Sequence, residues 1–130
     1  MTGESSNAPN AGSSSNASGG PLDSPGLAAA RDIAEVPAVE VITAAAVHLM
    51  SAAAVKCGLA QDVEPDLDEA RKLITALAAL VTAAAPEIGN QHARPLRDGL
   101  RSLQLAFREA SVVPDAPGQG PGEKWTGPVR

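Results

Sequence analysis

The chain has 130 residues and a formal net charge of −5, and only 2% of its residues are aromatic. No region is basic enough to indicate an extended nucleic-acid surface. The single cysteine, Cys57, excludes an intramolecular disulfide framework and suits a reducing compartment. Because no basic stretch followed by an apolar run occurs near the N-terminus, we expect no secretory signal peptide and a cytoplasmic location.

The two ends of the chain differ in composition from its middle. Residues 1–27 are rich in Ser, Asn, Gly and Pro, and residues 113–130 are rich in Pro and Gly. Neither stretch carries enough apolar surface to offset the entropy lost on ordering. We therefore expect a disordered N-terminal arm and a disordered C-terminal tail. The helical domain expected at residues 28–112 is of a size at which one core is only marginally stable by itself.

The first long helix is expected at about residues 37–57, from Pro37 to a stop at Gly58. The segment 41–55 within it has fifteen residues without a formal charge, fewer than the roughly 20 that a membrane span requires, so we expect no membrane insertion. This helix is apolar on almost every side. Two partner helices would leave about a third of its circumference bare, which indicates that a second copy of the chain covers it. The residues predicted at this oligomer interface are Val41, Ala45, His48 and Ala52.

Two further helices are expected at about residues 66–85 and 93–111. The first begins with Asp66 as N-cap and Glu69 in a capping box, and it should end before Pro86. The second starts between Asn90 and Arg94 and carries a leucine seam of the kind found in helical bundles. The lone helical glycine on it predicts a close neighbour, such as the first helix. Short connections favour an all-α, three-helix, up-down-up bundle.

Residues that could carry catalysis or bind a metal are few. His48 and Cys57 lie on opposite sides of one helix, so they cannot cooperate within one subunit. We expect His48 to be a partly buried, hydrogen-bonded histidine; the alternatives are pairing across a dimer or titration near neutral pH. Cys57, at a helix C-terminus, is expected to be an ordinary thiol. No companion ligand accompanies His92, and we predict no catalytic, cofactor or metal site and no enzymatic activity.

A row of arginines follows the leucine seam of the third helix at a spacing of three and four residues. It consists of Arg94, Arg97, Arg101 and Arg108, with Gln104 filling the gap. Arginine suits phosphate or carboxylate, so the row is a candidate partner-binding surface; the alternative is a solvated face tied by Asp98. The only tryptophan, Trp125, lies in the tail beside Lys124, where it is either incidental or a docking anchor.

The phrases "AVHLMSAAAVK" and "LRDGLRSLQLAFREAS", with "GPGEKWTGP" after them, resemble the actinobacterial branch of a family of small bacterial proteins, domain-of-unknown-function family 1844. The resemblance covers about residues 33–129 and supports a helical domain. It implies no established activity, so it assigns no functional residue.

Two functions are compatible with these features. The first is a non-enzymatic helical module that self-associates through its first helix and presents the arginine row and the tail to a protein partner. The alternative is an accessory factor that contacts the ribosome or another RNA–protein assembly through the arginine row, although no aromatic side chains accompany it to stack on bases. An enzyme with a site formed across a dimer at His48 is a weaker third hypothesis.

Overall fold

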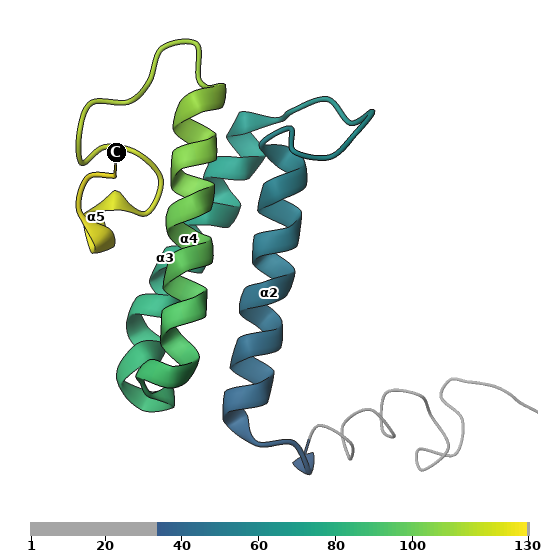
Figure 1. Ribbon diagram of the computed structural model, residues 1–130, viewed down its shortest axis with the longest axis vertical. Coiled ribbons are helices and arrows are strands. Elements are labelled where there is room, and N and C mark those ends of the chain that lie inside the picture. Colours follow the sequence, from purple (N-terminus) through teal and green to yellow (C-terminus); the bar gives the residue numbers. More distant parts are fainter. Residues whose placement is uncertain (1–33, 130) are drawn as a thin grey trace, which may run out of the picture. The chain divides into compact units, whose positions relative to one another are not determined.

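The computed structural model describes residues 34–129, and these contain helices and turns but no strand. Three long helices, α2 (Ala38–Lys56), α3 (Leu67–Ile88) and α4 (Asn90–Ala110), precede a single-turn helix, α5 (Glu123–Thr126) (Figure 1). The expected all-α, three-helix, up-down-up architecture is therefore confirmed. The arm expected at residues 1–27 lies outside the described residues.

The ends of α2 and α3 follow from local hydrogen bonding. Gly58 has a φ of +91°, and its N–H donates to the carbonyl of Val55 at 3.0 Å, which closes α2 where the sequence predicts. Asp66 caps α3 by accepting a hydrogen bond from the Glu69 N–H at 3.2 Å. The second half of the expected capping box is missing, because the Asp66 N–H donates to the Lys56 carbonyl at 2.8 Å. The Glu69 carboxylate pairs instead with Lys72 at 2.6 Å.

The predicted end of the second helix was wrong. α3 continues through Pro86 to Ile88, and Gly89 alone separates it from α4. Because Pro86 lies in the last turn, its missing N–H removes one hydrogen bond close to the helix end and does not break the helix. α4 begins at Asn90, so Pro95 lies one turn inside the helix and not in its first turn.

The core lies mainly between α3 and α4, which form the closest helix pair. The leucine seam of α4 is buried against one side of α3, while α2 contributes small side chains. Gly99 on α4 faces α2, because a Cβ at this position would overlap the Met50 sulfur. The close approach predicted at Gly99 is therefore present. The principal buried side chains are Ala46, Ala53, Cys57, Ile74, Leu77, Val81, Leu96, Leu100, Leu103 and Phe107.

The C-terminal tail is ordered from Val112 to Val129, which contradicts the expectation that it is disordered. It leaves the end of α4, turns back and places α5 against α3 (Figure 1). Few apolar side chains anchor the tail; among its valines, Val129 is buried, at 6% exposure. Polar contacts to α3 and α4 hold the rest, and composition alone does not reveal such contacts.

Candidate functional site

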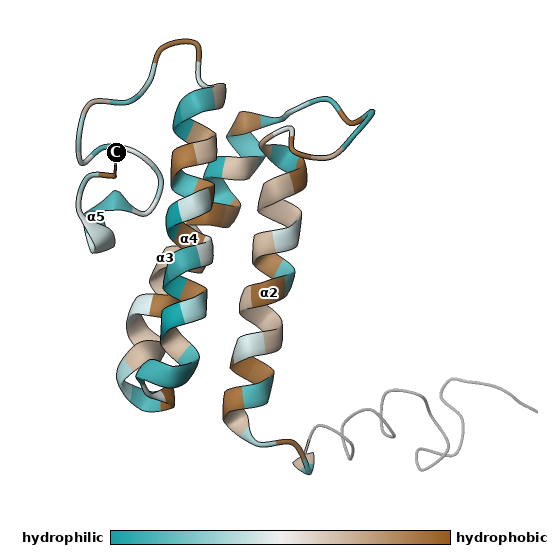
Figure 2. Cartoon of the chain, in the orientation of Figure 1, coloured by the Kyte–Doolittle hydropathy of each residue, from teal (hydrophilic) through white to brown (hydrophobic). Residues whose placement is uncertain are grey.

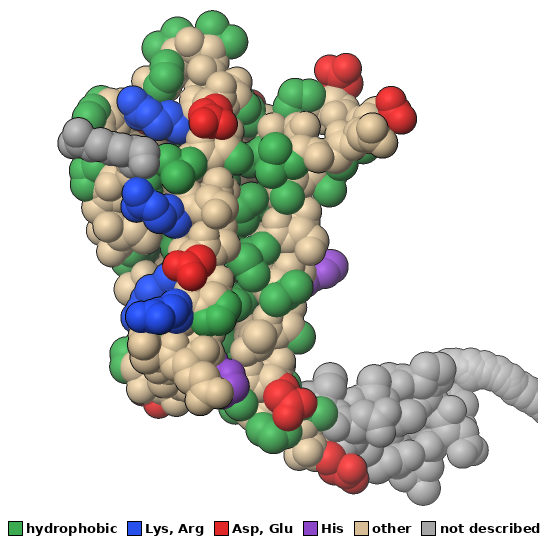
Figure 3. Space-filling model, viewed as in Figure 1, with side chains coloured by type: hydrophobic (Ala, Val, Ile, Leu, Met, Phe, Trp, Pro, Cys, Tyr) green, Lys and Arg blue, Asp and Glu red, His purple; other side chains and the backbone are tan. Residues whose placement is uncertain are grey.

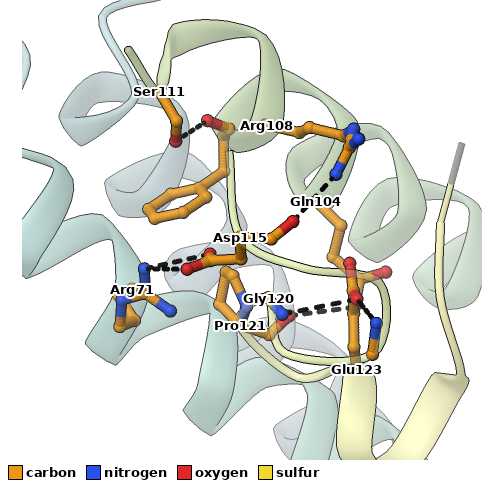
Figure 4. Close-up of polar contacts among 10 residues, drawn as sticks. Arg71, Gln104, Arg108, Ser111, Asp115, Gly120, Pro121 and Glu123 are labelled. Atoms are coloured by element: carbon orange, nitrogen blue, oxygen red, sulfur yellow. Dashed lines mark hydrogen bonds and ion pairs between the residues drawn. The ribbon is translucent and has the colours of Figure 1, made fainter. Parts of the chain in front are cut away.

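The start of the tail is fastened to α3 by an arginine. Arg71 Nη2 donates to both carboxylate oxygens of Asp115, at 3.0 and 3.2 Å, and the guanidinium lies 4.9 Å from the centre of the Phe107 ring (Figure 4). Arg108 on α4 donates to the Asp115 carbonyl at 3.3 Å. The side chains of Arg71 and Asp115 are 43% and 29% exposed, so the ion pair contributes at most about 1 kcal/mol. It positions the tail more than it stabilises it.

The end of the tail is held by two buried polar side chains. Glu123 is 7% exposed, and its Oε1 accepts hydrogen bonds from the N–H groups of Gly118 at 2.8 Å and Gly120 at 3.3 Å. Gln104 on α4 is 2% exposed, and its Nε2 donates to the carbonyl of Pro121 at 3.0 Å (Figure 4). The same Nε2 also donates to the Thr126 hydroxyl at 3.1 Å. Both ends of the turn that carries α5 are thereby fixed.

The docked tail creates a pocket of about 380 Å³ against α3 and α4. Arg97 and Arg101 of α4 line it together with Trp125 and the Thr126 hydroxyl. The Lys124 ammonium lies 4.7 Å from the centre of the Trp125 ring, but Lys124 lines a separate hollow with Arg71 and Thr75 and not this pocket. The apolar part of the lining comes from Val81, Leu100, Pro128 and Val129. We call this feature the tail pocket.

The structure brings together three of the five predicted partner-binding residues. Arg97, Arg101 and Trp125 meet in the tail pocket, Arg108 is occupied by the tail backbone, and Arg94 is exposed outside the pocket. Lys and Arg side chains form a column along α4 in Figure 3. Arg97 donates to the Asn90 side chain at 3.2 Å. Neutral groups therefore hold part of the arginine row, whereas the sequence suggested Asp98 as a possible partner for it.

Gln104 does not lie where the sequence predicts. The spacing places it in the exposed arginine row, but it is buried under the tail. Its position between Leu103 and Phe107 on α4 does not predict burial, because the sequence does not show that the tail lies over this side of the helix. Glu123 was missed for the same reason.

The outer face of α2 is the second candidate surface. Of the predicted interface residues, Val41, Ala45 and His48 are exposed and Ala52 is partly exposed. Val41 and Val55 are 43% and 36% exposed, which is high for aliphatic side chains of a long helix. Apolar residues continue along α2 in Figure 2, whereas α4 shows a hydrophilic outer side. His48 is not the partly buried histidine that the sequence suggested.

By length and composition alone, α2 could cross a membrane. It has 19 residues and a mean hydropathy of 1.7 over its most apolar window, of which 11% is buried in the described structure. A single such helix is weak evidence for membrane insertion, since core helices of soluble proteins have the same composition. The low buried share shows instead how little of this apolar helix the rest of residues 34–129 covers.

The remaining candidate residues are scattered. Cys57 is buried at 5% exposure, and this burial raises the pKa of its thiol, as expected for an unreactive cysteine. His92 lines a shallow hollow together with Glu40 and Thr43 of α2. Within residues 34–129, no group of three or more His, Cys, Asp or Glu side chains is placed to hold a metal ion.

Comparison with known protein families gives a match. The family model described as "Domain of unknown function (DUF1844)" matches residues 38–109. The chain belongs to this family. The match takes in α2, α3 and nearly all of α4, which is less than the 33–129 suggested by the resemblance, and the tail lies beyond it. No curated protein and no solved structure matches the chain.

Proposed function

We propose that this member of the family is a non-enzymatic, cytoplasmic helical module that self-associates through α2 and binds an acidic segment of a partner protein in the tail pocket. The observation that carries the proposal is the outer face of α2, an apolar helical surface that nothing in residues 34–129 covers. The phrases "LRDGLRSLQLAFREAS" and "GPGEKWTGP" also favour the actinobacterial branch of the family.

Self-association follows from the cost of leaving this face in water. Exposed apolar patches of this kind are uncommon on monomeric soluble proteins and usually mark an interaction site. Small side chains at Ala44, Ala45 and Ser51 lie between the valines of this face, so a second helix can approach it closely within the roughly 8 to 10 Å range for packed helices. Val41, Ala45 and Val55 would then lose their contact with water.

An acidic partner suits the tail pocket because two arginines line it together with an aromatic side chain. Arg97 and Arg101 line the pocket, and planar guanidinium groups bind carboxylates through paired hydrogen bonds. Trp125 is 38% exposed and supplies a rigid apolar surface beside them. An extended peptide with one acidic and one apolar side chain fits this combination of groups.

Self-association is tested by the solution mass of the full chain, measured by light scattering over a concentration series. We expect a dimer or larger species for the wild type and a monomer for Ala45→Glu, which places a charge on the outer face. The matched control is Ala76→Glu on α3, also exposed, which should leave the mass unchanged. A monomeric wild type at every concentration would contradict the proposal.

Peptide binding is tested by fluorescence, because Trp125 is the only tryptophan in the chain. A short peptide of alternating Glu and Leu should change the emission, and its affinity should fall about tenfold in Arg97→Gln, equivalent to about 1.4 kcal/mol. Arg94→Gln, in the same row but outside the pocket, is the control and should bind as the wild type does. Equal binding of a Lys and Leu peptide would contradict the assignment.

The arginine row also favours a second candidate, an accessory factor that contacts the ribosome or another RNA–protein assembly. Arg94, Arg97, Arg101 and Arg108 are all exposed along one side of α4. Phosphate binding would fall steeply with salt, because each neutralised phosphate releases counterions. Co-sedimentation with ribosomes at rising salt tests this function. Arg94→Gln should then weaken binding as much as Arg97→Gln, unlike the pattern expected for a peptide in the tail pocket.

A further inference from the structure

The outer face of α2 has the same residue pattern from either end. Its exposed stripe begins at Val41, passes through Ala44, His48 and Ser51, and ends at Val55. The order is therefore aliphatic, small, histidine, small, aliphatic. At 1.5 Å per residue the stripe is about 21 Å long, with His48 at its middle.

The centre of the stripe lies opposite the core. The α2 side chains buried against the other helices are Ala46 and Ala53, and Cys57 is buried just beyond its end. At about 100° per residue, Cys57 projects directly away from His48. A second helix placed against His48 would therefore meet α2 on the side away from α3 and α4.

The charges at the two ends of α2 favour one orientation of such a pair. Glu40 precedes His48 by eight residues, and Lys56 follows it by eight. An antiparallel pair centred on His48 places Glu40 of one copy and Lys56 of the other at the same end. A parallel pair would place two Glu40 side chains at one end and two Lys56 side chains at the other. The antiparallel arrangement also aligns opposite ends of the two helix dipoles.

We propose that two copies of this chain pair through α2 in antiparallel orientation, about a two-fold axis that passes between their two His48 side chains. The inference rests on the self-association proposed above and fixes its orientation and register. A two-fold axis makes the same patch serve both copies, which requires a self-complementary surface. The stripe meets this requirement, because Val41 packs against Val55 of the second copy and Ala44 lies near its Ser51.

The pairing also has a chemical consequence at the axis. The two His48 imidazoles meet there, flanked on each copy by Ala44, Ala45, Ser51 and Ala52, which carry no charge. Apart from the second imidazole, the charged groups of the two paired helices are Glu40 and Lys56. Each lies about 12 Å from His48 along the helix. Two neutral histidines can share a hydrogen bond, whereas two protonated ones repel each other.

Disulfide crosslinking in the full chain tests the register. Cys57→Ala removes the native thiol. Single cysteines are then introduced into separate chains as Val41→Cys, His48→Cys or Val55→Cys. When two variants are mixed, one of them carries a mass tag so that the crosslinked species can be told apart. Mild oxidation is followed by mass spectrometry, alongside light scattering of each reduced variant. All three sites are exposed in the described structure, so the substitutions leave the core intact.

We expect His48→Cys to crosslink with itself and Val41→Cys to crosslink with Val55→Cys only when the two chains are mixed. Crosslinking of Val41→Cys with itself would show a parallel pair and overturn the proposal, while leaving self-association in place. A reduced dimer that forms none of these disulfides would overturn it also, since the interface would lie elsewhere. A monomer at all concentrations would instead overturn the proposed self-association itself, and flotation of that monomer with lipid vesicles would assign the face to a membrane.

Discussion

α2 and α4 are helices of similar length in one domain, yet the chain covers them very differently. α4 buries its leucine seam against α3 and one flank, at Gln104, beneath the tail. α2 buries Ala46 and Ala53 in the core, and its Leu49 and Met50 are partly buried against it. Val41, His48 and Val55 lie outside. The helix with the more polar sequence is thus the better covered. This difference is the basis of our proposal that a second copy of the chain covers α2.

The largest effect should come from the covered side of the comparison. Leu77→Ala removes a fully buried side chain from the α3–α4 core, and we expect the free energy of unfolding in urea to fall by about 2 to 5 kcal/mol. Val47→Ala on α2, where the native side chain is 46% exposed, should cost less than about 0.5 kcal/mol. A comparable loss in both variants would mean that α2 is more deeply packed than its exposure indicates.

Releasing the tail should have the next largest effect. Gly122 has a φ of +76°, and a Cβ at this position would lie 2.5 Å from the Ala78 Cβ. Gly122→Ala should therefore detach α5, which we expect to appear as a red shift of Trp125 emission and rapid tryptic cleavage at Lys124.

The matched control is Gly127→Ala. It has a similar φ of +80°, but nothing lies within 4 Å of its Cβ position. This substitution introduces the backbone strain without the collision, so the tail should stay attached. If both variants release the tail equally, backbone conformation and not contact with α3 holds it in place.

The sequence predicts the helices well because their periodicity and caps are local features. Asp66 and Gly58 mark helix ends by their own chemistry. The predicted helix end before Pro86 was wrong because a proline in the last turn destabilises a helix little when few hydrogen bonds remain to be made. The prediction that the tail is disordered was wrong for a different reason. The roles of Gln104 and Glu123 in holding the tail can be inferred only when their hydrogen-bond partners are known to be close. The convergence of Arg97 and Trp125 depends on the same long-range fold.

The smallest effect concerns Cys57. Burial raises the pKa of its thiol, so the folded chain holds this proton more tightly than the unfolded chain does. The resulting stability is fully present below the unfolded thiol pKa of about 8.5 and declines as the pH rises through the higher pKa of the folded state. Urea unfolding between pH 7.5 and 10 should show this decline in the wild type and less of it in Cys57→Ala. Fast alkylation of the folded protein at pH 7.5 would contradict it.

The central claim is that a second copy covers α2, and an NMR dilution series of the full chain tests it most directly. Dilution should shift the amide signals of the outer stripe, at Val41, Ala44, His48, Ser51 and Val55. Signals of the buried Leu77 and of the tail at Trp125 should stay where they are. Signals that do not depend on concentration, or changes centred on Trp125, would contradict the account.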